Sequence, residues 1–197
     1  MTLLLASRST TRRHMLAQAD VPFQTADAPL DEEAAKRDLL RRGLPARTVA
    51  EELALAKARS VATTPGTLVL GADQTLELED GRMLNKAADR EEAAEQLRML
   101  SGRTHQLHAA AALVGDGAEL WRATESVRLL VRPLSAAFIQ SYLSAEWKTS
   151  RWSVGGYRIE GPGVQLFDRI EGSHFAILGL PLLPLLAELR TRRLIPS

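Results

Sequence analysis

Short apolar runs alternate with helix-like segments along the whole of this sequence, and this alternation limits the fold more than any other feature. The runs at residues 2–6, 67–72 and 107–114 have the length and apolar content of buried strands. Between them, charged segments carry Leu and Ala three and four residues apart, the pattern of amphipathic helices. Strands that interleave with helices predict an α/β fold with a mixed β-sheet flanked by helices.

The first strand leads into a helix through a polar loop. The run at residues 2–6 is followed by the loop SRSTT and by RRHMLAQAD, which has helical composition. The free N–H groups at a helix start can hold phosphate oxygens together with the polar side chains nearby, which are Ser7, Ser9, Thr10, Thr11, Arg12 and Arg13. The alternative is ordinary capping of the helix by Ser9 or Thr10, with the arginines in solvent. The spacing alone favours capping.

Periodicity and turn residues predict the remaining elements. Two amphipathic helices fit residues 31–62, with Gly43 and Pro45 between them. The other predictions are a helix capped by Asp89 that stops at Ser101-Gly102, a strand pair over 107–114 and 120–131, a helix capped by Ser135 that runs to Leu143, a loop over 144–163, a strand over 164–170 and a helix from Pro181 to about Arg193.

Asp73 directly follows the apolar run LVLGA, so its carboxylate is expected at the end of a strand, where α/β folds bind ligands. A hairpin with a two-residue turn at Asp80-Gly81 would place Lys86 opposite Thr75, at the same open end. A carboxylate that holds a divalent cation or activates water, beside a lysine that neutralises phosphate, suits hydrolysis of a phosphoanhydride. A plain salt bridge at the hairpin mouth is the alternative.

The composition excludes several kinds of function. The 25 basic and 24 acidic residues nearly cancel, so the chain lacks the diffuse positive field of a non-specific nucleic-acid binder. The absence of cysteine excludes thiolate catalysis and cysteine-bound zinc and favours a reducing compartment, so we expect a cytoplasmic protein. The four histidines lack metal-ligand spacing. The apolar run at residues 2–6 is too short for a membrane span or a signal peptide.

Four stretches in register resemble the Maf family of nucleotide pyrophosphatases over nearly the whole chain. They are LLLASRSTTRRHML, the LALAKA segment, LGADQTLELEDGRMLNKAADREEAAEQLRMLSGRTH and GGYRIEGPGVQLFDRIEGSHFAILGLPL. The resemblance implies two lobes around a deep cleft, as in the similar inosine triphosphatases. It also implies a divalent metal, Mg²⁺ or Mn²⁺, a nucleoside triphosphate substrate and a homodimer. The length of 197 residues suits one such domain over residues 1–197.

Carried over by position, the resemblance makes Asp73 the catalytic acid, which would bind the metal or accept the proton of the attacking water. The positions that match the family's triphosphate cleft are Ser7, Arg12, Lys57 and Lys86. Glu32 falls near a further acid of the family, although Asp31 or Glu33 can equally take that place. The residue pattern by itself predicts only solvated helix faces for Glu32 and Lys57.

The departures from the family pattern concern the phosphates. Where the common pattern has Ser-Pro-Arg-Arg, this chain has Ser9-Thr10-Thr11-Arg12, so one proline and one phosphate-binding arginine are missing. Where it has Lys-Pro, this chain has Lys86-Ala87. Loss of a charge-assisted contact to phosphate costs roughly 1.5 to 3 kcal/mol if nothing replaces it, which predicts weaker or altered substrate binding.

Two other departures concern the base. The pyrimidine-preferring branch of the family resembles Gly-Ala/Ser-Asp-Thr and Ile-Gln-Gly. This chain has Gln74 in place of the Thr of the first motif and Glu160 in place of the Gln of the second. An ionised Glu only accepts hydrogen bonds and therefore suits the N1–H and 2-amino donors of guanine. Thr11, Gln74 and Glu160 together resemble the 7-methyl-GTP pyrophosphatase branch, although Thr11 matches neither branch well.

The resulting prediction is a hydrolase that cleaves a nucleoside triphosphate to the monophosphate and pyrophosphate, with 7-methyl-GTP as the preferred substrate. Two alternative enzymes are a pyrimidine pyrophosphatase acting on dTTP or UTP and an inosine triphosphatase. A third alternative is a nucleotide-binding regulator of cell division with little activity.

Overall fold

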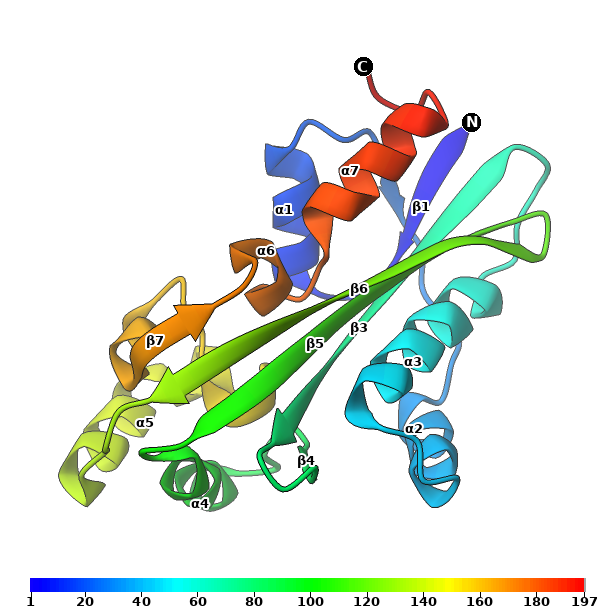
Figure 1. The fold of residues 1–197 in the computed structure, drawn as a ribbon. Coiled ribbons are helices and arrows are strands. Elements are labelled where there is room, and N and C mark those ends of the chain that lie inside the picture. Colours follow the sequence, from blue (N-terminus) through cyan, green and yellow to red (C-terminus); the bar gives the residue numbers. More distant parts are fainter. Residues whose placement is uncertain (197) are drawn as a thin grey trace. The chain divides into compact units, whose positions relative to one another are not determined.

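Strands and helices interleave through residues 1–196, the part of the chain that the structure, a computed structural model, describes (Figure 1). The strands are β1 Thr2–Ala6, β2 Gln24–Thr25, β3 Thr67–Leu78, β4 Met83–Leu84, β5 Thr104–Gly115, β6 Ala118–Val131 and β7 Phe167–Glu171. The α-helices are α1 Thr10–Gln18, α2 Glu32–Arg41, α3 Ala46–Ser60, α4 Arg90–Leu100, α5 Ala136–Ser150, α6 His174–Ile177 and α7 Leu182–Thr191. Two 3-10 helices, η1 Val154–Gly156 and η2 Pro162–Leu166, follow α5. The predicted α/β class is confirmed.

The strands form one mixed sheet. Their order is β2-β1-β3-β5-β6-β7, and β4 pairs with β3 outside this path. β1 is parallel to β2 and to β3, and Ala6 lies opposite Gly71 in the last pair with β3. β4 and β7 are antiparallel to β3 and β6. Among the helices described, none is long and apolar enough to cross a bilayer.

The chain divides into two compact units. The first contains Met1–Gln74, His108–Glu125 and the chain from Ser173 onward, and the second contains Thr75–Leu107 and Ser126–Gly172. β3, β5 and β6 each pass from one unit to the other along their length. Each unit is therefore built from segments that lie far apart in the sequence.

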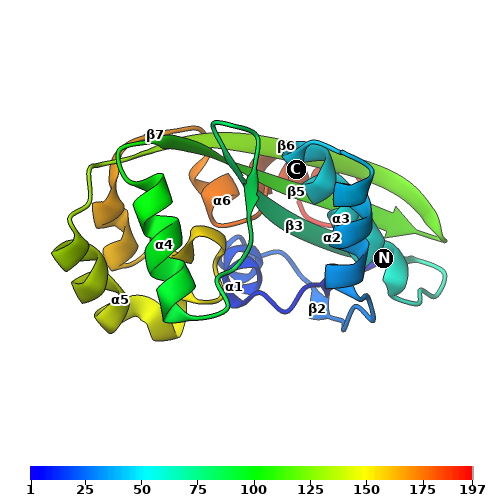
Figure 2. The same ribbon diagram turned by 90° about the horizontal axis from the view of Figure 1, so that it is seen from below.

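In the first unit, helices cover both faces of the sheet (Figures 1 and 2). One core, which contains the apolar residues of α1 and α7, packs on β1 and β3 through Leu3, Leu5, Leu68, Leu70, Met15, Leu16, Leu185 and Leu189. The other face packs on α3 through Ala6, Val69, Ala50, Ala54, Leu55 and Ala58. The alanines on α3 have small side chains, so this helix can lie close to the strands.

In the second unit, α4 packs against α5 and η1, and Figure 2 shows the two helices side by side. The predicted caps are both present. Asp89 accepts a hydrogen bond from the Glu92 N–H at 2.9 Å, and Ser135 accepts one from the Phe138 N–H at 3.1 Å. The Glu92 carboxylate in turn accepts from the Ala88 N–H at 2.8 Å, close to a capping box.

The segment between Leu143 and Phe167 differs from the prediction. α5 continues to Ser150 instead of ending at Leu143, because no Gly or Pro interrupts residues 144–150. The strand predicted over 164–170 begins only at Phe167, since residues 162–166 form η2. β2 and α6 are too short to leave a periodic signal in the sequence and were not predicted.

Candidate active site

Asp73 lies just past the end of the parallel strand pair. β3 continues to Leu78, so the prediction that its strand ends at Ala72 is wrong; the later half of β3 pairs with β4 in the hairpin. The neighbouring β1 does end, at Ala6, and its last partner on β3 is Gly71. Asp73 therefore lies beside the carboxyl end of the parallel strand β1, although its own strand, β3, continues past it.

Alternation along β3 turns Asp73 toward α3. Leu70 and Ala72 belong to the core under α1 and α7, whereas Val69 packs with α3. Residues two apart in a strand share a face, so Asp73 lies on the α3 side. Lys57 in the last turn of α3 meets it there, with Nζ 2.6 Å from Asp73 Oδ1.

A second carboxylate reaches the same ammonium group. Glu32 begins α2, and its Oε2 lies 2.8 Å from Lys57 Nζ. Asp31 has a different role, because its Oδ1 caps α2 by accepting from the Ala34 N–H at 2.9 Å. The resemblance allowed Asp31, Glu32 or Glu33 to take the position of the family's further acid. Of these three, Glu32 is the one that joins Lys57 and Asp73.

These three residues form a charged cluster that opens to solvent on one side. The Lys57 side chain is 7% exposed and that of Asp73 14%, whereas that of Glu32 is 45% exposed. A buried ammonium needs opposite charge nearby, and here it has two carboxylates. The prediction that Lys57 lies on a solvated helix face is therefore wrong. The cluster carries one net negative charge when all three groups are ionised.

Arg12 is buried beside this cluster and is held by backbone carbonyls. Its Nε donates to the Gly179 carbonyl at 2.7 Å, and its Nη1 donates to the Ala72 carbonyl at 3.0 Å. Burial lowers the pKa of Arg12, and the negative charges of Asp73 and Glu32 act in the opposite direction. The sequence gives no signal for the two acceptors, because each is a main-chain carbonyl.

The start of α1 is capped by a serine, and Arg12 in its first turn is buried. Ser9 is the N-cap and accepts from the Arg12 N–H at 3.3 Å, so capping is confirmed. Ser7 Oγ accepts from the Ser9 N–H at 3.3 Å and from Arg12 Nη1 at 3.4 Å. The buried Arg12 guanidinium is not the solvated group that the capping interpretation assumed.

A small cavity of about 180 Å³ adjoins Ser7. Its lining consists of Ser7, Arg8, Arg13, Thr25, Ala26 and Asp27. Arg8 and Arg13 are exposed, in contrast to Arg12, and can move to meet an anion. The cavity therefore offers two guanidinium groups, although this chain has Thr11 at the position where the family pattern has an arginine.

Gln74 and Thr11, predicted to select the base, also lie in the first unit. The Gln74 side-chain amide donates to the carbonyls of Ala176 at 2.8 Å and Ile177 at 3.0 Å, which fastens β3 to α6. Thr11 is half-buried in the first turn of α1. Both Gln74 N–H groups thus have a structural use, independent of any nucleotide.

Lys86 belongs to the second unit, and the hairpin that carries it has another register than predicted. Leu76 lies opposite Leu84, and the Leu78 N–H donates to the Arg82 carbonyl at 2.8 Å. The loop therefore has three residues, Glu79 to Gly81, with Gly81 at φ 82° as in a bulged turn. The predicted pairing of Lys86 with Thr75 is wrong, since strand pairing stops at Leu84.

Glu160 is exposed in the second unit, in the turn between η1 and η2. Its Oε1 accepts from Arg158 Nε at 3.2 Å. Nearby, Tyr157 is buried and its hydroxyl lies 2.7 Å from His105 Nε2. Burial lowers the pKa of His105 to about 4, so this imidazole is neutral. The pair anchors the backbone that leads to Glu160.

The first unit also offers oxygen ligands for a metal. Glu32 and Asp73 supply carboxylates, the donors that Mg²⁺ and Mn²⁺ prefer. Within residues 1–196, no group of three or more His, Asp or Glu side chains is arranged to hold a cation. The donor set therefore fits a divalent ion that takes one or two protein carboxylates and completes its shell with substrate oxygens and water.

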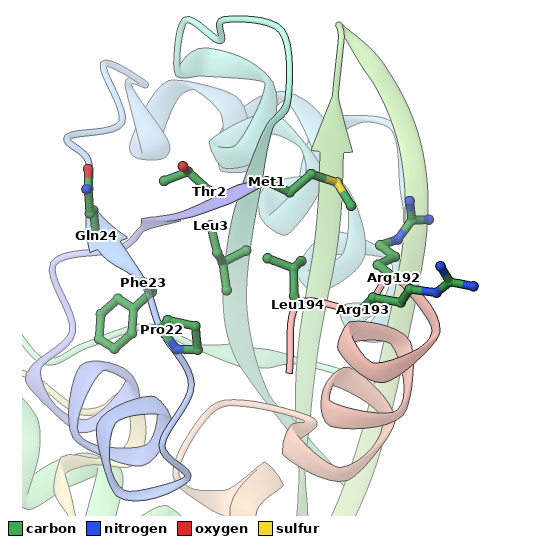
Figure 3. A pocket seen from close by; sticks show the side chains of 9 residues that line it. All are labelled: Met1, Thr2, Leu3, Pro22, Phe23, Gln24, Arg192, Arg193 and Leu194. Atoms are coloured by element: carbon green, nitrogen blue, oxygen red, sulfur yellow. The ribbon is translucent and has the colours of Figure 1, made fainter. Parts of the chain in front are cut away.

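A larger cavity of about 500 Å³ lies at the opposite end of β1 (Figure 3). Met1 and the first two residues of β1, Thr2 and Leu3, line it together with Phe23. The nine described residues that line it include no carboxylate, and Figure 3 shows the side chains of its two arginines pointing away from Phe23. This cavity lacks the groups needed to activate water, so the Lys57 cluster is the better candidate.

Comparison with known proteins agrees with the resemblance noted in the sequence. The family described as Maf-like protein matches residues 2–192. A nucleoside triphosphate pyrophosphatase from Sphingopyxis alaskensis is 49% identical over 100% of both chains, and one from Nitrobacter winogradskyi is 51% identical over 98% of this chain and 95% of the relative. A 7-methyl-GTP pyrophosphatase from Brucella abortus is 45% identical over 98% of this chain and 97% of the relative. This chain therefore belongs to the Maf-like protein family.

Proposed function

We propose that this protein hydrolyses nucleoside triphosphates to nucleoside monophosphates and pyrophosphate. The observation that carries the proposal is the Lys57 ammonium, bonded at once to Asp73 and Glu32. The buried Arg12 and the small basic cavity at Ser7 lie in the same unit and supply groups that suit phosphate oxygens. The names of the relatives from Sphingopyxis alaskensis and Nitrobacter winogradskyi support the same activity.

In this proposal Asp73 accepts the proton of the attacking water. The water oxygen bonds to a phosphorus atom, a P–O bond of the α–β bridge breaks, and pyrophosphate leaves. Lys57 and Arg12 offset negative charge on the phosphates as the bond breaks. Asp73 and Glu32 would hold Mg²⁺ or Mn²⁺, which supplies further positive charge to the phosphate oxygens.

We further propose that 7-methyl-GTP is the preferred substrate. Glu160 is exposed, and a carboxylate can only accept hydrogen bonds, which matches the N1–H and 2-amino donors of a guanine. The relative from Brucella abortus is named for 7-methyl-GTP. Thr11 and Gln74 are proposed as further determinants of the base, and Lys86 as a contact to the triphosphate.

The organisation of the enzyme is part of the proposal. The chain would act as one nucleotide-binding domain over residues 1–197. The near-neutral, cysteine-free chain suits a cytoplasmic enzyme without nucleic-acid or membrane partners. A homodimer is proposed from the family resemblance.

Pyrophosphate release tests the activity. The purified protein is assayed with Mg²⁺ or Mn²⁺ on UTP, dTTP, CTP, GTP, 7-methyl-GTP and ITP. Asp73→Asn should abolish turnover, and Asp20→Asn, an exposed acid of the same unit, should not change it. Turnover that persists in Asp73→Asn would exclude Asp73 as the proton acceptor.

The substrate pattern separates the alternatives. A preference for 7-methyl-GTP that weakens in Glu160→Gln supports the role of Glu160. A preference for UTP or dTTP keeps the reaction and rejects the base assignment, and a preference for ITP identifies the inosine triphosphatase alternative. Nucleotide binding without turnover under any metal would favour a regulator.

A further inference from the structure

The carboxylates that suit a divalent cation are already bonded to a cation that belongs to the chain. Lys57 Nζ lies 2.6 Å from Asp73 Oδ1 and 2.8 Å from Glu32 Oε2. Both oxygens are thus within one hydrogen-bond length of the same nitrogen. A metal that bridged these two oxygens would have to occupy the same region as the ammonium group.

Burial makes this competition strong. With its side chain only 7% exposed, the Lys57 ammonium is poorly hydrated and depends on the two carboxylates for stabilisation. A divalent cation placed on those carboxylates would stand next to an ammonium that has lost its partners. Like charges at a few Å in a partly buried site repel far more than in water.

We propose that Lys57 is an internal counter-cation that keeps the carboxylate pair from binding divalent metal until a nucleotide arrives. The inference rests on the proposed function. Phosphate oxygens of the nucleotide give the ammonium a new partner, and Asp73 and Glu32 are then released to the metal. Nucleotide and metal binding therefore strengthen one another, and by linkage the effect is reciprocal.

An alternative is that Lys57 only stabilises the fold through its salt bridges. The two roles predict opposite effects of a neutral residue on metal binding. If Lys57 competes with metal, its removal frees the carboxylates and strengthens metal binding. If it only holds the carboxylates in place, its removal lets them separate and weakens metal binding.

The test is a titration of the nucleotide-free protein with Mn²⁺, in which the free ion is followed by electron paramagnetic resonance. Lys57→Met should bind Mn²⁺ about tenfold or more tightly than the wild type. Lys148→Met, which removes an exposed lysine of α5, should match the wild type. The double variant Lys57→Met with Asp73→Asn should lose the gain, since the gained site includes Asp73.

Two further variants keep the result decisive. Lys57→Gln is also neutral and keeps N–H donors for the carboxylates, so it should show the gain even if Lys57→Met does not fold. Lys57→Arg keeps the positive charge and should show none. Unchanged or weaker Mn²⁺ binding in folded Lys57→Met or Lys57→Gln overturns the inference, as does a gain that survives Asp73→Asn.

The inference and the proposed function fail separately. If the wild type releases pyrophosphate but the neutral variants bind Mn²⁺ no better, the counter-cation role is wrong and the enzyme assignment stands. If the neutral variants bind Mn²⁺ more tightly but the wild type hydrolyses no nucleotide, the competition is real and the reaction is wrong.

Discussion

The backbone of Gly71 lies directly against that of Ala54: a Cβ at Gly71 would stand 2.0 Å from the Ala54 carbonyl oxygen. It would also stand 2.7 Å from the Ala58 backbone nitrogen. This approach sets the distance between β3 and α3. Lys57 lies on the same helical turn, and Asp73 lies two residues further along the strand, so the contact also sets the geometry of their ion pair.

Gly71→Ala should therefore destabilise the protein and impair the site together. The atoms that a methyl group would meet are main-chain atoms, which cannot rotate away, so we expect a loss of about 2 to 3 kcal/mol in the free energy of unfolding. Urea unfolding measures it. Gly161→Ala is the matched control, because its Cβ would meet Glu146 Oε2 at an ordinary 3.7 Å. Equal losses in both variants would contradict the close-packing argument.

Arg12 and its neighbour Arg13 should respond differently to substitution. Arg12→Lys loses donors to the carbonyls of Gly179 and Ala72, and we expect the free energy of unfolding to fall by about 2 kcal/mol. Arg13→Ala should change it by less than about 0.5 kcal/mol, since that side chain is exposed. If Arg13 binds phosphate, the KM for nucleotide should rise in Arg13→Ala while thermal unfolding stays unchanged. A loss of stability in Arg13→Ala equal to that in Arg12→Lys would refute the distinction.

Gln74→Glu should weaken the attachment of α6 to β3. The substitution replaces an amide that donates to two carbonyls with a carboxylate that can only accept, so oxygen would face oxygen. We expect a loss of about 1 to 3 kcal/mol, measured by denaturant unfolding. Gln140→Glu, on the exposed side of α5, serves as the control and should be nearly neutral.

The stability of the protein should depend on His105 in the acid range. Burial lowers the pKa of His105 from 6.5 to about 4. Between these two pH values the unfolded chain binds a proton that the folded protein does not, so the free energy of unfolding falls as the pH falls. The slope approaches about 1.4 kcal/mol per pH unit and vanishes below the folded-state pKa. This contribution is fully present above pH 6.5.

His105→Gln isolates that contribution. The amide cannot titrate, yet it can still bond to the Tyr157 hydroxyl, so the stability difference between wild type and variant should shrink from neutral pH toward pH 4. Urea unfolding at a series of pH values measures the difference. A difference that stays constant over this range would mean that His105 titrates normally in the folded protein.

Local patterns in the sequence were sufficient for most elements but not for the register of the hairpin. The periodicity of α2 and α3 and the caps at Asp89 and Ser135 depend on neighbouring residues, so they were predictable. The hairpin turns at Asp80-Gly81 as expected, yet Glu79 joins the loop and moves every later pair by one residue. The Asp-Gly dipeptide does not fix the loop length.

The candidate site was predictable only in part. The family resemblance pointed to Glu32, Lys57 and Asp73, but the residue pattern alone gave a solvated face for Lys57. Its burial depends on the packing of α3 against β3, a tertiary contact that the periodicity of the helix does not encode. Likewise, the structural use of the Gln74 amide depends on the position of α6, a helix too short to predict.

The hydrogen bond from Arg12 to the Gly179 carbonyl spans 167 residues of chain. During synthesis on a ribosome, Arg12 emerges early, whereas its acceptor, the Gly179 carbonyl, is made near the end. A nascent chain can therefore form β1 and α1 long before the guanidinium finds its final position. Activity should appear only in released or nearly released polypeptides, and a protein truncated before residue 179 should be inactive even if most of its strands are present.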